Sequence, residues 1–304
     1  MSRGAAYADS PRAPLASTGV GLTILAATIW GSSFAAVQVS LGYTSPVLLV
    51  ALRFGLAGLL AVLVTSLVGR SGLALAPLRT RRAWWMGALY SSAFVLQFLG
   101  QSIAGIANST LLSNLFPILA PVLAVVVLGD AFGARTASAL AVGVVGLSVV
   151  ALPGLTSSPA TLSGDVLLLA SSLAYALFIV ASKKYSGDGG PGALSLLVVV
   201  GVLYSPVLLY TLFFHRPELT LPISIWLAIV YLAVPCSLVA LGIYLFALRW
   251  ISASRSAFLL LFEPIVGIVL ATIWYRNSIT GPILVGGTLI VGALAIANWP
   301  ERGR

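Results

Sequence analysis

Long apolar segments dominate this chain and restrict the folds that are open to it. Ten can be separated along the sequence, and each approaches or exceeds the ~20 residues that an α-helix needs to cross the hydrocarbon core of a bilayer. Of the 304 residues, 60% are hydrophobic and 8% are charged, too few charges to cover a water-soluble domain. The segments are longer than a membrane strand needs, so the sequence predicts an all-α integral membrane protein in contact with lipid.

The ten predicted transmembrane helices are joined mostly by short connections, so consecutive helices should be antiparallel neighbours. Residues 1–17, which are small, polar and proline-containing, are expected to form a disordered cytoplasmic tail, and residues 300–304 a second one. The first apolar run is long enough to span and lacks an obvious cleavage site, so we expect no signal peptide. The expected spans are 18–41, 46–68, 83–106, 108–128, 134–152, 162–182, 192–214, 223–248, 251–275 and 279–299.

The distribution of basic residues predicts an orientation in the membrane. All but three of the sixteen Lys and Arg residues fall on one side of the predicted helices, the exceptions being Arg216 and Arg276 on the other side and Arg53 within a helix. Positively charged loops stay in the cytoplasm, which predicts a multi-pass protein of the cytoplasmic (inner) cell membrane with both termini cytoplasmic. The net charge of +9 follows from this topology and requires no nucleic-acid partner.

The two halves of the chain repeat one another. A shift of 147 residues carries Ser109 onto Ser256 and Pro117 onto Pro264, within helices of similar design. Each half has five helices, an odd number, so the second half must enter the membrane from the opposite side. Inverted repeats with a site near the bilayer midplane at their interface are typical of secondary transporters. The expected divisions are a first repeat over 18–152, a linker over 153–161 and a second repeat over 162–299.

Several short motifs occur in the order found in a known family of membrane proteins. They are WGSSF at Trp30–Phe34, LRF at Leu52–Phe54 and ALRWISASRSAFLLLFEP at Ala247–Pro264. With them the chain resembles the EamA-type branch of the drug/metabolite transporter superfamily, and within it is similar to bacterial aromatic amino-acid exporters. The resemblance implies a ten-helix carrier whose central cavity is lined by the first, third and fourth helix of each half. The family often has Glu after each proline-bearing helix, where this chain has Asp130 and Asn277, so no function is carried onto those positions.

Two ionisable residues fall deep inside the predicted membrane segments, Arg53 and Glu263. A charge at that depth is costly, about 2.5–3.5 kcal/mol on insertion scales, and is treated as functional by default. Glu263 could bind a proton that drives exchange, meet the amino group of a substrate, or form a structural hydrogen bond to a neighbouring helix. Arg53 is expected to snorkel or to satisfy carbonyls of an adjacent helix, with contact to a substrate carboxylate as the alternative.

Aromatic and polar side chains on the helices expected to face the centre form the candidate substrate-binding site. Their rings would make an amphipathic pocket for an aromatic or apolar solute, although ordinary helix packing explains any single ring better. The polar groups could bind a solute's amino or carboxyl group, or could join helices by hydrogen bonds. Together with Glu263, the predicted substrate-binding residues are Trp30, Tyr90, Phe94, Gln97, Gln101, Ser113, Asn114, Tyr175, Phe178, Tyr244 and Phe262.

Signatures of enzymes are missing from the sequence, so no cofactor is expected. The single histidine, His215, belongs to no cluster that could hold a metal, and no glycine-rich phosphate loop indicates ATP hydrolysis. We therefore expect a secondary or facilitative carrier that exports small organic metabolites, amino acids first among them, by alternating access. A channel would need a selectivity loop that is not present, and a non-transporting subunit or scaffold would not need Glu263 or the inverted repeat. The expected bend points are Pro117, Pro121, Pro235 and Pro264.

Overall fold

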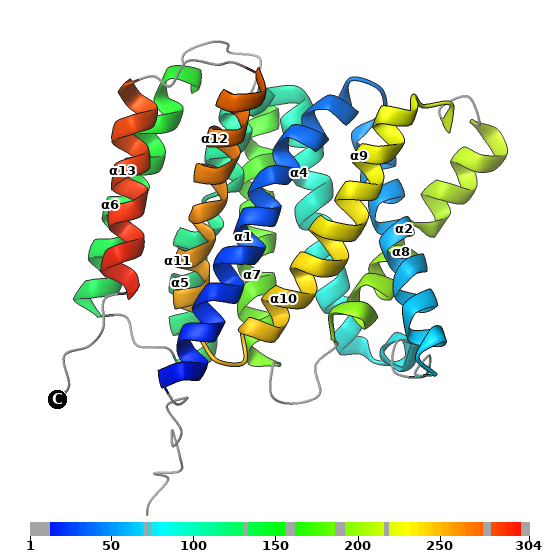
Figure 1. Ribbon diagram of the computed structural model, residues 1–304, viewed down its shortest axis with the longest axis horizontal. Coiled ribbons are helices and arrows are strands. Elements are labelled where there is room, and N and C mark those ends of the chain that lie inside the picture. The colour runs from blue at the N-terminus through cyan, green and yellow to red at the C-terminus, as the bar shows by residue number, and fades with distance from the viewer. Residues whose placement is uncertain are drawn as a thin grey trace, which may run out of the picture.

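The computed structural model of the chain is a bundle of helices, and no strand occurs among the residues that it describes. Most of the helices run between the same two ends of the bundle (Figure 1). The described residues are 13–69, 72, 75–129, 133–155, 162–185, 192–215, 219–275 and 281–298.

The first half of the chain forms two long helices, a short 3-10 turn and three further helices. Capping residues mark several of their ends, as at Ser45, whose side chain accepts a hydrogen bond from the Leu48 amide beside a proline at the first helical position. Gly129, with φ of 73°, ends α5 in the left-handed conformation that glycine favours. The elements are α1 (Ala13–Leu41), α2 (Pro46–Leu67), η1 (Ala76–Arg79), α4 (Arg81–Ser113), α5 (Phe116–Leu128) and α6 (Ala134–Leu155).

The second half follows the same plan with more interruptions. A π-helical turn, η4, joins α9 to α10, so that the three elements form one continuous rod. Among the described residues, α1, α2, α7, α8 and this rod are each long and apolar enough to cross a membrane by length and composition. The elements are α7 (Leu162–Lys184), α8 (Ala193–Phe214), α9 (Ile223–Ala233), η4 (Val234–Val239), α10 (Ala240–Ala247), α11 (Ala253–Leu260), α12 (Phe262–Tyr275) and α13 (Gly281–Asn298).

The chain reverses direction within helix α4, so that the first and last parts of this helix are antiparallel. Ser171 and Ser172 are neighbours on α7, yet the Ser171 hydroxyl donates to the Ala93 carbonyl at 2.7 Å and the Ser172 hydroxyl donates to the Leu112 carbonyl. A straight helix would separate Ala93 from Leu112 by about 28 Å, so the chain reverses direction between them. The third predicted span, 83–106, and the start of the fourth, 108–128, therefore both belong to α4. The helical backbone continues through residue 107, where the two predicted spans were separated.

The proline-bearing span of each half is interrupted shortly before the proline that the two halves share. In the first half the interruption falls at Asn114–Leu115, between α4 and α5, and in the second half it falls at Leu261, between α11 and α12. The shift of 147 residues that superposes the two sequence repeats also superposes these two breaks. Of the other expected bend points, Pro235 lies in the π-turn η4, whereas α5 continues uninterrupted through Pro121.

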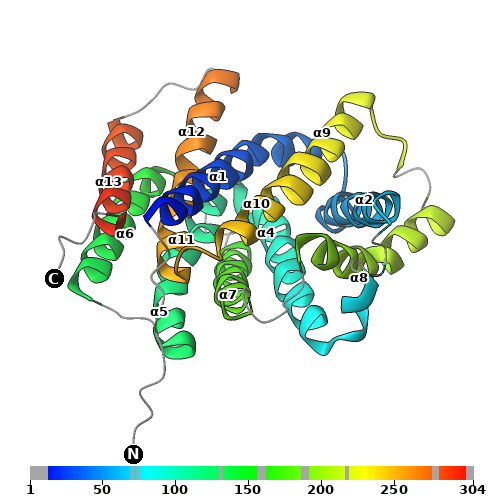
Figure 2. The same ribbon diagram turned by 60° about the horizontal axis from the view of Figure 1, so that its bottom comes forward.

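The helices pack in pairs that are preserved when the two halves are exchanged. Helix α1 packs against α10 and α12, and its counterpart α7 packs against α4 and α5. Helix α2 packs against its own counterpart α8, and α6 against α13, as Figures 1 and 2 show. This exchange symmetry, with five helices in each half, confirms the predicted fold class of an all-α membrane protein built from two inverted repeats.

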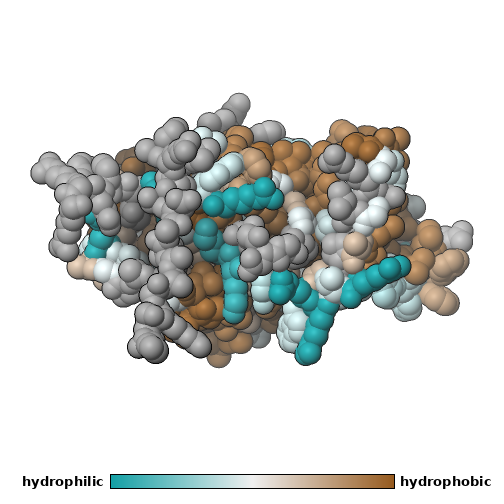
Figure 3. All heavy atoms as spheres, turned by 90° about the horizontal axis from the view of Figure 1, so that it is seen from below, coloured by the Kyte–Doolittle hydropathy of each residue, from teal (hydrophilic) through white to brown (hydrophobic). Residues whose placement is uncertain are grey.

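Basic side chains meet at one end of the bundle. The Arg82 guanidinium, at the start of α4, lies 4.2 Å from the ring centre of Tyr185 just beyond α7. Beside it, the Lys183 ammonium donates to the Leu248 carbonyl at the end of α10 at 2.8 Å. Figure 3 looks onto this end and shows hydrophilic side chains gathered among hydrophobic ones. These contacts bring three of the predicted cytoplasmic connections to a common face.

The predicted tails lie mostly outside the described residues. Residues 1–12 and 299–304 are not described, whereas α1 already begins at Ala13, inside the first expected tail. Helix α6 continues to Leu155, so the first three residues of the expected linker are helical. Asp130 and Asn277, the positions at which the sequence departs from the family pattern, are also outside the described residues.

Candidate functional site

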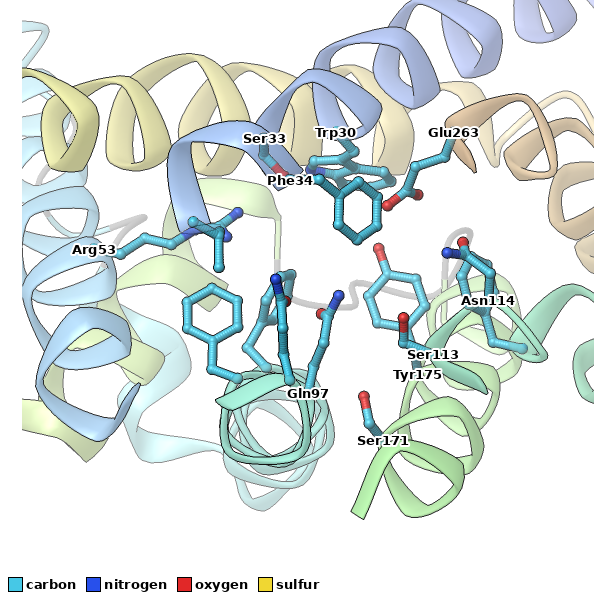
Figure 4. Close-up of a pocket in the computed structure, with 15 residues that line it drawn as sticks. Trp30, Ser33, Phe34, Arg53, Gln97, Ser113, Asn114, Ser171, Tyr175 and Glu263 are labelled. Atoms are coloured by element: carbon cyan, nitrogen blue, oxygen red, sulfur yellow. The ribbon is translucent and has the colours of Figure 1, made fainter. Parts of the chain in front are cut away.

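A cavity lies where the two halves meet, between α1, α4 and α7 and beside the first turns of α5 and α12 (Figure 4). Its volume of about 30 Å³ leaves room for a water molecule or two. A metabolite could therefore occupy it only if the surrounding helices moved apart. The fifteen residues that line the cavity are Trp30, Ser33, Phe34, Val37, Arg53, Phe94, Gln97, Phe98, Gln101, Ser113, Asn114, Phe116, Ser171, Tyr175 and Glu263.

Aromatic rings from both halves of the chain form one wall of the cavity. Tyr175 on α7 stands at its centre, with its ring edge-on to Trp30 at 6.3 Å, to Phe94 at 6.1 Å and to Phe116 at 4.7 Å between ring centres. Edge-to-face contacts of this kind stabilise each ring pair by about 0.5–1.5 kcal/mol beyond the burial of area. The rings are thus fixed in place as a surface that suits an apolar or aromatic group.

The π-turn η4 supplies the anchor for Trp30. The Trp30 indole donates its Nε1 hydrogen to the Cys236 carbonyl at 2.6 Å, across 206 residues of sequence. In the π-turn the backbone ladder changes register, since the Ala240 amide donates to the Pro235 carbonyl five residues before it. Single π-turns inside α-helices occur frequently at functional sites, and here the turn presents a carbonyl to the edge of the cavity.

Arg53 reaches the cavity from α2, although its side chain is only 1% exposed. Its Nε donates to the Ser237 hydroxyl at 2.8 Å, and its Nη2 donates to the Cys236 carbonyl at 3.4 Å. The guanidinium also lies 4.6 Å from the ring centre of Phe94 and 5.1 Å from that of Phe54, distances at which a cation is attracted to a ring face. The π-turn therefore holds both Trp30 and Arg53.

Glu263 enters the cavity from the first turn of α12 (Figure 4). Its backbone is held against α1, because a Cβ atom added to Gly31 would lie 2.4 Å from the Glu263 carbonyl oxygen. The half-buried Glu263 side chain makes no hydrogen bond or ion pair with any other described residue. Arg53 and Glu263 are the two charged residues among the fifteen that line the cavity.

Polar side chains complete the lining. The Gln101 amide Nε2 donates to Gln38 Oε1 at 3.2 Å, while its own Oε1 is buried without a hydrogen-bond partner. Such a buried acceptor costs about 1–3 kcal/mol unless a water or a ligand satisfies it. In the described part of the chain, no group of three or more His, Cys, Asp or Glu residues could hold a metal ion.

The structure brings eight of the twelve predicted site residues together around this cavity and places four elsewhere. Tyr90 lies behind the aromatic wall, 4.7 Å from Phe178 between ring centres. Tyr244 packs against the Trp30 ring at 5.3 Å, and Phe262 is partly buried against the hydrophobic core. The eight that line the cavity are Trp30, Phe94, Gln97, Gln101, Ser113, Asn114, Tyr175 and Glu263.

Seven lining residues were absent from the predicted set. Phe34 lies four residues after Trp30 and Phe98 four after Phe94, so the helical period could have found both. Arg53 was expected to contact a neighbouring helix, and it does, but it also faces the cavity from a helix expected at the periphery. The rod α9–α10, expected to line the centre, contributes no side chain to this cavity. The remaining additions are Ser33, Val37, Phe116 and Ser171.

Comparisons with known proteins agree with this architecture. The sequence profile of the EamA-like transporter family matches residues 17–152 and again residues 162–299. The "Probable amino-acid metabolite efflux pump" of Salmonella typhimurium is 26% identical over 291 residues, 93% of this chain and 95% of that protein. The "Uncharacterized transporter YyaM" of Bacillus subtilis is 26% identical over 257 residues, 79% and 81% of the two chains. One crystal structure superposes with a TM-score of 0.75 at 20% identity, covering 93% of this chain and 96% of the other, which supports the fold alone.

Proposed function

Because the chain belongs to the EamA-like transporter family, we propose that it exports small organic metabolites, and specifically amino acids with aromatic or apolar side chains. The observation that carries this proposal is the cavity between the two repeats, whose lining combines aromatic rings with charged and amide groups. Such a mixed lining suits a solute with a polar head and an apolar body. The relatives named as amino-acid metabolite efflux pumps support the same substrate class.

The proposed mechanism is alternating access by movement of the two halves about this cavity. The cavity is too small for an amino acid, so the structure corresponds to a contracted arrangement of the helices around it. The two symmetry-related breaks, at Asn114–Leu115 and at Leu261, are points at which the helices that close the cavity can bend. Discontinuous helices beside a midplane site serve this purpose in other transporter folds.

We further propose that the basic end of the bundle faces the cytoplasm, with both termini on that side of the cytoplasmic membrane. The contacts of Arg82 and Lys183 place basic connections at one end, and cytoplasmic loops carry an excess of Lys and Arg. Cysteine labelling at residues 5 and 303 in intact cells and in opened membranes tests this orientation. Labelling of the two termini from opposite faces would overturn it together with the inverted-repeat argument.

Reconstituted transport tests the proposed function directly. Purified protein in liposomes should accelerate counterflow of labelled amino acids with saturation, measured over a panel of amino acids and other metabolites at two pH values. Tyr175→Ala should slow this flux, because the ring stands at the centre of the cavity wall, whereas Trp85→Ala, at an exposed position outside the cavity, should not. Failure of every metabolite to show saturable flux would refute the proposal, and large unsaturated ionic currents would favour a channel.

Coupling to a proton is a second part of the proposal. Glu263 is the one carboxylate among the residues that line the cavity, and a carboxylate at membrane depth can exchange a proton during transport. The pH arm of the counterflow experiment, repeated with Glu263→Gln, tests whether this residue carries the coupling proton.

A further inference from the structure

We propose that Arg53 and Glu263 form the two ends of a zwitterion site, in which Arg53 binds the carboxylate and Glu263 binds the ammonium group of an α-amino acid. The inference rests on the proposed function and deepens it by assigning one residue of the cavity lining to each charged group of the amino acid. It assigns a role in substrate selection to Arg53.

The first observation is that the Arg53 guanidinium is only partly satisfied. A guanidinium has five N–H donors, and two of them, on Nε and Nη2, meet Ser237 and the Cys236 carbonyl. The other three make no hydrogen bond to any described residue, although the side chain is 1% exposed and lines the cavity. A planar fork with open donors matches the two oxygens of a carboxylate.

The second observation is that Glu263 is equally without a polar partner. Its side chain points into the cavity from the side opposite Arg53, with the Trp30 ring between them (Figure 4). No described Lys or Arg lies within ion-pair distance of it, Arg53 included. The carboxylate therefore faces the cavity as an acceptor that an ammonium group could fill.

Both groups are held in place by the same part of the structure. Arg53 shares the Cys236 carbonyl with Trp30, and the residue after Trp30 is Gly31, which lies directly against the Glu263 backbone. The charges thus approach the cavity from two flanks of one tryptophan, and in this arrangement the Arg53 guanidinium and the Glu263 backbone are both held in place. A zwitterion placed between them would satisfy both, and its side chain would lie along the aromatic wall.

A solute with a single charge would satisfy one group and leave the other buried without a partner. An unsatisfied buried charge is costly, so an amine or a carboxylic acid of the same shape should bind much more weakly than the amino acid. This difference in affinity distinguishes a zwitterion site from a purely aromatic pocket, which would accept the amino acid, the amine and the carboxylic acid alike. It also separates it from a purely structural role, for which solute charge is irrelevant.

The experiment compares three probes that share a phenyl ring: L-phenylalanine, phenethylamine and 3-phenylpropionate. Binding to the full-length protein in detergent is measured by calorimetry, independently of transport. We expect phenylalanine to bind at least about tenfold more tightly than either analogue. Equal binding of the three, or no binding of phenylalanine, would overturn the site, whereas absence of flux in liposomes despite selective binding would refute the transport proposal instead.

Two variants assign the ends of the site. Arg53→Gln should weaken binding of phenylalanine and phenylpropionate by about tenfold and should not weaken binding of phenethylamine, whereas Glu263→Gln should weaken binding of phenylalanine and phenethylamine but not of phenylpropionate. Arg249→Gln and Asp165→Asn, which change charge outside the cavity, are the matched controls. Equal loss of all three probes in both variants would show a structural role and overturn the assignment. If a variant fails to fold, the comparison on the unmodified protein still decides the proposal.

Discussion

Alanine at Gly31 should separate α1 from α12 and destabilise the protein. A Cβ atom at this position would lie 2.4 Å from the Glu263 carbonyl oxygen and 2.8 Å from the Cβ atom of Val266. Neither atom can rotate away, because one belongs to the backbone and the other is bonded to it, so the helices themselves must shift. Overpacking of this kind costs about 1–3 kcal/mol, which exceeds the roughly 0.5–1 kcal/mol that alanine gains over glycine in a helix.

The same helix provides a matched control for this substitution. A Cβ atom at Gly21 would have nothing within 4 Å, so Gly21→Ala should be neutral or stabilising by about 0.5–1 kcal/mol. In thermal unfolding in detergent, the Gly31→Ala protein should therefore melt at a lower temperature than the unmodified protein, and the Gly21→Ala protein at the same or a higher temperature. A shift of about 1.5 °C is expected for each kcal/mol in a chain of 304 residues, because the entropy of unfolding is about 2.1 cal/mol/K per residue. If the Gly31→Ala protein melts at or above the temperature of the Gly21→Ala protein, the close approach of α1 to the Glu263 backbone is not real.

Three further substitutions test the cavity. Glu263→Gln should alter the rate of transport or its pH profile in liposomes while the protein still inserts, and unchanged transport at every pH would remove this residue from the mechanism. Trp30→Phe deletes the hydrogen bond to the Cys236 carbonyl and should cost about 1 kcal/mol in thermal unfolding; an unchanged melting temperature would count against that anchor. Ser237→Ala removes the acceptor that orients Arg53 Nε and should weaken phenylalanine binding by about fivefold without affecting phenethylamine, so an equal loss of both probes would exclude this positioning role.

The fold could be predicted from the sequence because each part of the evidence for it is local. Apolar segments about 20 residues long require helices, since a backbone in lipid must satisfy its own hydrogen bonds. The matched prolines located the two interrupted helices, although the breaks themselves lie shortly before Pro117 and Pro264, at Asn114–Leu115 and Leu261. The boundary between the third and fourth predicted spans is marked in the structure by the reversal of direction inside α4, without a break in the helix.

The candidate site could be predicted only in part, because the rotation of each helix about its axis leaves no trace in an apolar sequence. Lipid is as apolar as the protein interior, so a membrane helix needs no polar outer face and no amphipathic pattern marks its inner one. Phe94 and Tyr90 lie one turn apart on α4, and the first lines the cavity while the second packs behind it. Composition could not distinguish them.

The sequence by itself determined that this chain crosses a membrane as two related sets of helices, because hydrophobic length, repeated prolines and the placement of basic residues are properties of the chain alone. Only the tertiary structure decided which side chains share the cavity. Arg53 shows the difference most clearly: its own helix is peripheral, and it reaches the cavity because a π-turn in another helix, nearly two hundred residues away, holds its guanidinium there. Contacts between distant segments depend on how helices dock, and docking is set by close packing in three dimensions.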